Sequence, residues 1–398
     1  WEFEIDQSLS GKERKLYEAH QLAGKITVPF CPESELSGVN FKDFMSCVWY
    51  RRELTLPEGW IKGLTEAGER IVLHFGAVDY LTTVYVNGKE VGTHKGGYSS
   101  FSFDITHYIN VEDGKAVITV CAEDDLRSRR QPAGKQSNKL VSYGCYYTRT
   151  TGIWQTVWLE KIPAVHIDSF KLYPDIENAT LRITAQVTGA GELTAKASYQ
   201  GQAMGEATVK AVPGQVDLVL SLKELHLWEL GEGRLYDLEL TFGHDQIASY
   251  FGMRSVRMEG MKFLLNGKDL FITGICRHDL WTDDVAFTQT DDMIETDLKM
   301  MKSMGVNYVR LVHYPHDRRV VAAADRIGLL CSEEPGLWWS DLSNKEITTR
   351  ALHPSSRWYT GAGIYRDLFL WEGGDIRIEP WDKHITTPAL DTVKAVYE

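Results

Sequence analysis

The sequence lacks three features that would each define a class of protein: paired cysteines, a long apolar run and a basic stripe. Its six cysteines are scattered without a C-x-x-C pair, which argues against a metal-ligand set and a disulfide framework. Reduced thiols favour a cytoplasmic protein. No apolar run approaches the roughly 20 residues of a membrane-spanning helix, so we expect no membrane partner. No signal peptide is visible in the sequence, which begins at Trp1, and we expect a periplasmic or secreted location only if one was removed.

The charge balance is acidic, with a formal net charge of −12. Such a chain is poorly suited to binding nucleic acid or an anionic membrane. With 43% hydrophobic and 25% charged residues the composition is that of an ordinary globular protein, and 398 residues predict two or three domains. Twelve Trp and eighteen Tyr are many for this length. Aromatic rings stack on sugar faces, although packing in a core is their commoner use.

Two blocks of short alternating segments occupy the first part of the chain. Residues 1–162 alternate apolar and polar positions between turn signals, which predicts a β-sandwich. Asn87-Gly88 interrupts one such segment and predicts a type I′ hairpin turn. Residues 163–258 repeat the alternation, which predicts an immunoglobulin-like sandwich of ordinary size.

The period changes in residues 259–354, where strand–helix–strand spacing predicts the start of a parallel α/β barrel. The expected elements are strand 268–274, helix 290–304, strand 307–312, helix 318–326 and strand 329–332. In such barrels the chemistry sits at the C-terminal ends of the strands. These ends carry several ionisable residues, namely Arg277, His278, Asp279, Arg310, His313, Glu333 and Glu334.

Three ordered motifs in this region make the chain similar to a known family. The segments FLLNGKDLFITGICRHD (263–279), VNYVRLVHYPHD (306–317) and DRIGLLCSEEP (325–335) resemble the start of the catalytic barrel of glycoside hydrolase family 2. That family includes β-galactosidases, β-glucuronidases and β-mannosidases. The resemblance implies an N-terminal jelly-roll sandwich, an immunoglobulin-like sandwich and a (β/α)8 TIM barrel that is incomplete here. It further implies retaining hydrolysis of β-linked glycosides, a carbohydrate substrate and homo-oligomers.

The same resemblance suggests roles for five residues. Arg310 matches an arginine that holds the catalytic nucleophile ionised, with a core salt bridge as the alternative. His278 and His313 match histidines that hydrogen-bond the sugar. Asp279 stands where the family usually has Glu, and Glu334 matches an acid that lines the subsite or pairs with Arg310.

Other charged residues carry a structural and a functional interpretation side by side. We expect Arg277 to be structural and Arg254 to form a structural ion pair across a domain boundary. The polar, basic segment 127–139 is either a solvated loop or a loop for substrate recognition. Glu333 and Glu334 make a poor catalytic pair, because neighbours on one strand point in opposite directions.

The resemblance ends before the barrel does. A barrel takes about 250 residues, whereas only residues 262–398 remain and hold about three strands. Residues 355–398 instead resemble the junction between the two sandwiches, since Gly363-Ile364-Tyr365 repeats Gly152-Ile153-Trp154.

The two catalytic glutamates of the family have no counterpart that we can assign. One of them belongs to an Asn-Glu pair in the family, and this chain has no Asn-Glu dipeptide. A non-catalytic carbohydrate-binding or structural fragment is therefore the alternative function, and a lectin-like role of the first sandwich is a third. Some relatives hold Mg²⁺ or Na⁺, but no ligand set for either is recognisable, so we expect no cofactor.

Overall fold

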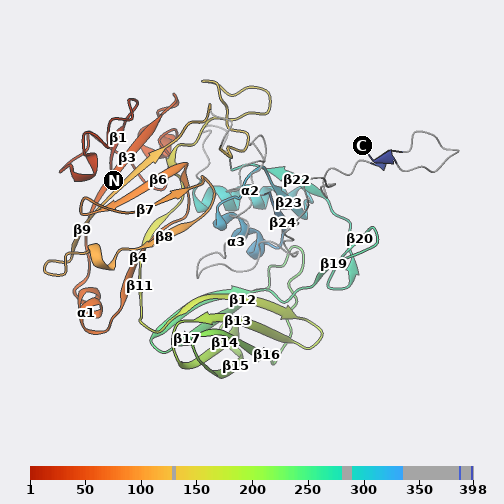
Figure 1. Cartoon of the computed structure of the whole chain (residues 1–398). Helices are drawn as coiled ribbons and strands as arrows, with labels where there is room; N and C mark the ends of the chain where they lie inside the picture. Colours follow the sequence, from red (N-terminus) through yellow and green to blue (C-terminus); the bar gives the residue numbers. More distant parts are fainter. Residues whose placement is uncertain (128–130, 280–288, 335–384, 387–395, 398) are drawn as a thin grey trace. The chain divides into compact units, whose positions relative to one another are not determined.

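The computed structural model describes residues 1–127, 131–279 and 289–334, with the backbone of 385–386 and 396–397 (Figure 1). The chain divides into one unit of residues 1–363 and a second of residues 364–398. In the second unit, β25 (Ile385–Thr386) and β26 (Val396–Tyr397) pair in antiparallel fashion. The predicted junction-like tail, residues 355–398, otherwise lies outside the described residues.

The first sandwich is built from strands β1 to β11. Their bounds are β1 (Glu2–Ile5), β2 (Gly24–Lys25), β3 (Cys47–Thr55), β4 (Arg70–Phe75), β5 (Val78–Asp79), β6 (Leu81–Val86), β7 (Lys89–Lys95), β8 (Phe101–Asp104), β9 (Lys115–Glu123), β10 (Gly152–Ile153) and β11 (Val157–Ile162). A six-stranded sheet has the order β2-β1-β3-β9-β6-β7, and smaller sheets have the orders β11-β4-β8 and β10-β5. A short helix, α1 (Glu58–Glu66), follows β3. The predicted sandwich is confirmed.

Local chemistry explains the tightest hairpin of this sandwich. Strands β6 and β7 pair through Val86 and Lys89, with Asn87 and Gly88 between them at φ 50° and 75°. A type I′ turn needs positive φ at both central residues, so the predicted turn is confirmed.

Trp49 and Trp154 are fully buried, so these two rings pack in the core, which is the commoner use of tryptophan.

The second sandwich has seven strands in two sheets. They are β12 (Ile167–Asp175), β13 (Thr180–Val187), β14 (Gly191–Tyr199), β15 (Gln202–Ala211), β16 (Gly214–Ser221), β17 (Tyr236–Phe242) and β18 (Asp245–Phe251). The sheet orders are β12-β13-β16 and β15-β14-β17-β18, all antiparallel. Alternate residues of each sheet point into one shared apolar core, as the immunoglobulin-like prediction requires.

An antiparallel ribbon leads out of the second sandwich and corrects one prediction. It consists of β19 (Val256–Glu259), β20 (Lys262–Leu265) and β21 (Lys268–Asp269). The predicted strand 268–274 is therefore wrong, because Lys268 and Asp269 fold back on β20. The cause is the Asn266-Gly267 turn, with φ 51° and 77°, which closes a hairpin before the parallel sheet begins.

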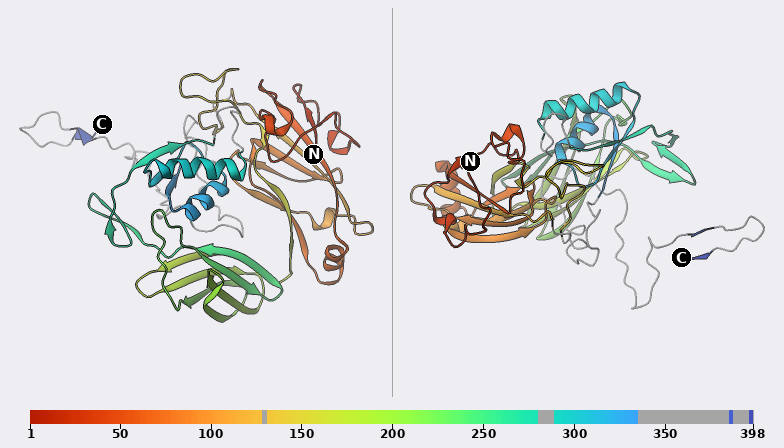
Figure 2. Two further views of the ribbon diagram at one scale, coloured as in Figure 1. Left: turned by 180° about the vertical axis from the view of Figure 1, so that it is seen from behind. Right: turned by 90° about the horizontal axis from the view of Figure 1, so that it is seen from above.

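The parallel part begins later than expected but has the expected order. It contains β22 (Gly274–Arg277), α2 (Asp291–Ser303), β23 (Tyr308–Leu311), α3 (Arg318–Ile327) and β24 (Leu330–Glu333). The three strands pair in parallel in the order β22-β23-β24, and α2 and α3 lie beside each other (Figure 2). This confirms a multidomain fold of two sandwiches followed by the start of a barrel.

The caps of these helices follow from the sequence. The hydroxyl of Thr290 accepts a hydrogen bond from Met293 N, and the carboxylate of Asp317 accepts one from Arg319 N. Gly328 ends α3 with a φ of 82°. Among the described residues, no helix is long and apolar enough to cross a membrane.

The second sandwich is joined to α3 through Asp325. Its carboxylate pairs with Arg254 at 3.1 Å and accepts a hydrogen bond from Tyr250 Oη at 3.2 Å. The indole of Trp228 donates to the Asp325 carbonyl at 2.8 Å. The predicted structural pair of Arg254 is thereby confirmed.

Candidate functional site

Four of the predicted site residues meet at the C-terminal ends of the parallel strands. We call His278, Arg310, His313 and Glu334 the strand-end cluster. The Glu334 carboxylate forms an ion pair with Arg310 and lies 3.1 Å from Nδ1 of His313. The ring of His313 is 5.3 Å from the ring of His278. Parallel pairing of β22, β23 and β24 places all four at one edge of the sheet.

Both imidazoles of the cluster are neutral near pH 7. Burial, with the positive charges of neighbouring groups, lowers the pKa of His278 to about 4. Burial and the nearby Lys135 ammonium also lower the pKa of His313, although Glu334 acts in the opposite sense. A neutral imidazole offers one donor and one acceptor, a combination that suits sugar hydroxyls.

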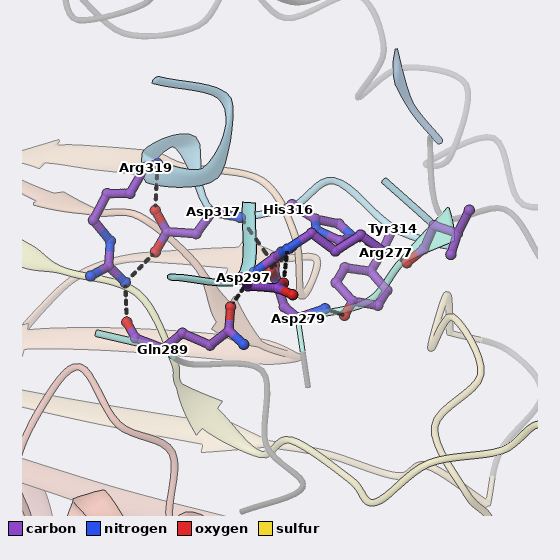
Figure 3. A network of polar contacts seen from close by, with 9 residues as sticks. Arg277, Asp279, Gln289, Asp297, Tyr314, His316, Asp317 and Arg319 are labelled. Atoms are coloured by element: carbon purple, nitrogen blue, oxygen red, sulfur yellow. Dashed lines mark hydrogen bonds and ion pairs between the residues drawn. The ribbon is translucent and has the colours of Figure 1, made fainter. Parts of the chain in front are cut away.

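The fifth predicted residue, Asp279, belongs to a buried polar network (Figure 3). Its carboxylate forms an ion pair with Arg277 and lies 3.1 Å from Nδ1 of His316. Only 1% of Asp279 is exposed. Burial opposes its ionisation, but the charges of His316 and Arg277 outweigh burial and lower the pKa of Asp279 to about 2. This burial excludes direct contact between Asp279 and a sugar, and the ion pair with Arg277 joins Asp279 to the buried network.

The buried network ties the strand ends to both helices. Arg277 Nε donates to Asp297 Oδ2 of α2 at 2.7 Å, and its Nη2 donates to Gln289. The Gln289 carbonyl accepts a hydrogen bond from Arg319 of α3 at 2.9 Å (Figure 3). Arg277 is 2% exposed and reaches no open surface, which agrees with its predicted structural role.

The first sandwich also contributes side chains to this region. The ring of Tyr147 meets the His278 ring edge-on at 5.7 Å, and Tyr98 stacks on Tyr314 at 5.3 Å. Arg318 Nη2 donates to Ser100 Oγ at 2.7 Å. Tyr147 belongs to the loop that follows β9, and Tyr98 and Ser100 belong to the turn between β7 and β8. Both segments of the first sandwich therefore contact residues of the parallel part.

The loop that follows β9 includes the described part of the predicted segment 127–139. Several of its residues are buried, namely Gln131, Pro132, Gly134, Gln136 and Ser137. The solvated-loop interpretation is therefore wrong for residues 131–137, while 128–130 lie outside the described residues. Glu333, one residue before Glu334, ends β24, where strand alternation directs its side chain away from that of Glu334.

Sequence reasoning did not single out His316, Tyr314 or Tyr147. His316 and Tyr314 lie within the quoted motif VNYVRLVHYPHD, so a search of that motif for buried polar partners could have found them. Tyr147 comes from a different domain, and nothing in its local sequence points to the site. In the described ranges, no group of three or more His, Cys, Asp or Glu could hold a metal ion.

Two sandwiches followed by a parallel strand–helix sheet with a polar cluster at its strand ends define a modular protein of the sandwich–barrel class. Residues 22–163 match the family model described as "Glycosyl hydrolases family 2, sugar binding domain". Residues 165–254 match "Glycosyl hydrolases family 2", and residues 256–351 match its "TIM barrel domain". The chain belongs to glycoside hydrolase family 2.

Three relatives of this chain are longer than it is. A β-galactosidase of Thermoanaerobacter pseudethanolicus is 28% identical over 77% of this chain and 42% of its own length. A β-glucuronidase of Paenibacillus borealis is 24% identical over 83% of this chain and 56% of its own. The solved Ruminococcus gnavus β-glucuronidase has the same fold, with a TM-score of 0.69, 21% identity and coverage of 84% of this chain and 56% of that one. The chain thus spans about half the length of these relatives.

Proposed function

We propose that the protein acts in the retaining hydrolysis of β-linked glycosides, in the manner of a β-galactosidase or β-glucuronidase. The observation that carries the proposal is the strand-end cluster, placed where barrels of this class hold their chemistry. Neutral imidazoles, a guanidinium and a carboxylate at one edge of the sheet can together hydrogen-bond the hydroxyl groups of a pyranoside.

The mechanism needs two carboxyl groups about 5 Å apart, one as nucleophile and one as acid and base. Attack on the anomeric carbon forms a glycosyl-enzyme, which water then hydrolyses. Glu334 is the one carboxylate within the strand-end cluster as defined above, and it forms an ion pair with Arg310. We assign the four cluster residues to substrate binding and leave the reacting pair unassigned.

The alternative is a carbohydrate-binding or structural protein without turnover. The single carboxylate of the strand-end cluster, Glu334, favours this second function, because turnover needs two carboxyl groups. Such a binding protein would use the same sugar site, because binding requires only the strand-end cluster.

Hydrolysis of 4-nitrophenyl β-galactoside and β-glucuronide, with the intact mass of the chain verified, separates the two functions. Release of 4-nitrophenol that is lost in a Glu334→Gln, His313→Ala double variant supports the glycosidase. Sugar binding without release, detected by calorimetry, supports the binding protein. Neither release nor binding contradicts both.

Three further expectations belong to the same proposal. A cytoplasmic location is expected from the reduced cysteines; all six are free thiols in the described residues. Function without a metal or other cofactor and assembly into homo-oligomers are predictions, which metal analysis and light scattering of the purified protein can check.

A further inference from the structure

Two buried cysteines of the first sandwich contact each other across neighbouring strands. Cys47 is the first residue of β3, and Cys121 lies near the end of β9. Their Sγ atoms are 3.3 Å apart, and one thiol donates a hydrogen bond to the other. Disulfide sulfurs are about 2.05 Å apart, so a bond between these two would bring them about 1.2 Å closer. The two cysteines are therefore close neighbours that are not bonded to each other.

The register of the sheet fixes this contact. Cys47 is opposite Glu123, and Trp49 is opposite Cys121. Residues two positions apart on a strand share a face, so all four side chains belong to one face of the sheet. The two cysteines are thus diagonal neighbours on that face. Because β3 pairs with β9 along all nine of its residues, the strands cannot slide to separate the two sulfur atoms.

Residues that follow β1 share a buried apolar cluster with both cysteines, among them Leu16 and Leu22. Only 2% of Cys47 and 1% of Cys121 are exposed, so a bulky reagent reaches neither sulfur in the folded sandwich. The hydrogen bond with Cys121 and burial both raise the pKa of Cys47, which keeps its thiol protonated and slow to react. For each cysteine, the other is thus the reaction partner that the fold supplies.

We propose that Cys47 and Cys121 are a redox modification site, which forms a disulfide between β3 and β9 in an oxidising thiol–disulfide buffer and returns to two thiols in a reducing one. The cysteines are 74 residues apart in the sequence, so the crosslink restricts a long loop of the unfolded chain and stabilises the first sandwich. The site lies outside the strand-end cluster and does not depend on the proposed function.

The oxidant is a small disulfide such as glutathione disulfide, and the exchange has two steps. One cysteine thiolate attacks a sulfur of the oxidant, which breaks its S–S bond, forms a mixed disulfide and releases one glutathione that takes up the proton. The second cysteine attacks the protein sulfur of the mixed disulfide, which forms the protein S–S bond and releases the second glutathione. Two protein thiols are oxidised and one glutathione disulfide is reduced. Because both sulfurs are buried, the first step requires local opening or takes place while the chain folds, whereas the second is intramolecular.

The test is a disulfide map of the whole chain in two glutathione buffers, one rich in the disulfide and one rich in the thiol. Folded protein and protein refolded from urea are equilibrated in each buffer, and free thiols are then blocked in denaturant. In the oxidised refolded sample, mass spectrometry should find the Cys47 and Cys121 peptides linked, about tenfold or more above any other linkage. The reduced samples should contain no link. Cysteines that remain free, keep glutathione or link elsewhere in the oxidised refolded sample would overturn the proposal.

Calorimetry then shows whether the crosslink stabilises the sandwich. We expect the Tm of the linked wild type to lie about 5–10 °C above that of the reduced wild type, because the disulfide restricts the unfolded chain. Cys47→Ala and Cys121→Ala each remove the link, and each should have one Tm in both buffers whatever its starting stability. Cys145→Ser, which removes an exposed thiol, is the matched control and should gain as much as the wild type. Equal Tm values for linked and reduced wild type, or the same gain in an alanine variant, would contradict the proposal.

Discussion

Two carboxyl groups of this protein are buried to the same extent, yet one is ionised and the other is neutral near pH 7. Asp279 at the strand ends and Glu33 in the first sandwich are each 1% exposed. The pKa of Asp279 is lowered to about 2, whereas that of Glu33 is raised to about 8. Burial penalises the charge in both, so burial alone does not decide whether an acid is ionised. The cation within reach decides it.

The surroundings of Glu33 show why it stays neutral. Its Oε2 accepts a hydrogen bond from Thr151 N at 3.2 Å, and its buried Oε1 has no hydrogen-bond partner in the described structure. Asp124, whose own pKa burial raises to about 7, accepts from Thr151 Oγ1 at 3.1 Å and adds repulsion. Arg149 is near, but its guanidinium donates to the carbonyls of Lys42, Lys139 and Leu140. Because the Arg149 guanidinium is bound to carbonyl oxygens, it does not balance a charge on Glu33 in the way that Arg277 balances the charge on Asp279.

Removing the cation from the ionised site should have the largest effect. Arg277→Met leaves Asp279 and Asp297 without their guanidinium, and a buried charge without its partner costs about 3–5 kcal/mol. We expect a loss of this size in the free energy of unfolding by urea. Arg326→Met, which breaks the exposed pair with Glu295, is the control and should change stability far less. Similar losses in the two variants would contradict the assigned role of Arg277.

Replacing the neutral acid should give the next largest effect, which should grow as the pH rises from 5 to 8. The folded pKa of Glu33 lies above its unfolded value of 4.5, so the stability of the neutral form is full below pH 4.5 and is lost as pH rises to about 8. Glu33→Gln removes this loss. Relative to wild type, its free energy of unfolding should rise by about 2–4 kcal/mol between pH 5 and pH 8.

The measurement for Glu33 is urea unfolding at several pH values. Glu35→Gln, two residues away and exposed, is the matched control and should keep a constant offset from wild type. A constant offset for Glu33→Gln as well would show that Glu33 is already ionised at pH 5.

The opposite pH dependence is expected of Asp279. Its folded pKa is depressed below 3.8, so its stabilisation is present above pH 3.8 and is lost as pH falls toward 2. Asp279→Asn should be less stable than wild type at pH 7, and the gap should shrink by about 2 kcal/mol between pH 5 and pH 2. Thermal unfolding followed by circular dichroism across this range checks the prediction. Parallel curves for variant and wild type would falsify it.

The smallest effect concerns the cluster itself. The Glu334 carboxylate raises the pKa of His313 against the effects of burial and Lys135. Glu334→Gln should therefore lower the pKa of His313 further, and the pKa of His278 should follow only through its contact with His313. NMR titration of the two imidazoles measures both. An upward shift of the His313 pKa would place Glu334 outside the cluster.

Most of the architecture could be predicted because it depends on local patterns. Alternation is enough for the sandwiches, and the parallel pairing of β22 to β24 brings Arg310, His313 and Glu334 to one edge. The first barrel strand was misplaced because the Asn266-Gly267 turn was not given its weight as a hairpin signal. We predicted that Asp279 and His278 belong to the same site. Adjacent residues of an extended segment point in opposite directions, and here the side chain of Asp279 is the buried one.

The local sequence pattern of polar and apolar residues, with its turn and cap residues, was sufficient to identify the family and to locate the C-terminal ends of the parallel strands. It could not establish the charge state of Glu33 or Asp279, because each depends on groups far away in the chain, such as Asp124 or His316. Nor could it predict that Tyr147 contacts His278. Electrostatic and packing energies depend on the distances between atoms in space. Only the tertiary structure sets these distances for residues that lie far apart in the sequence.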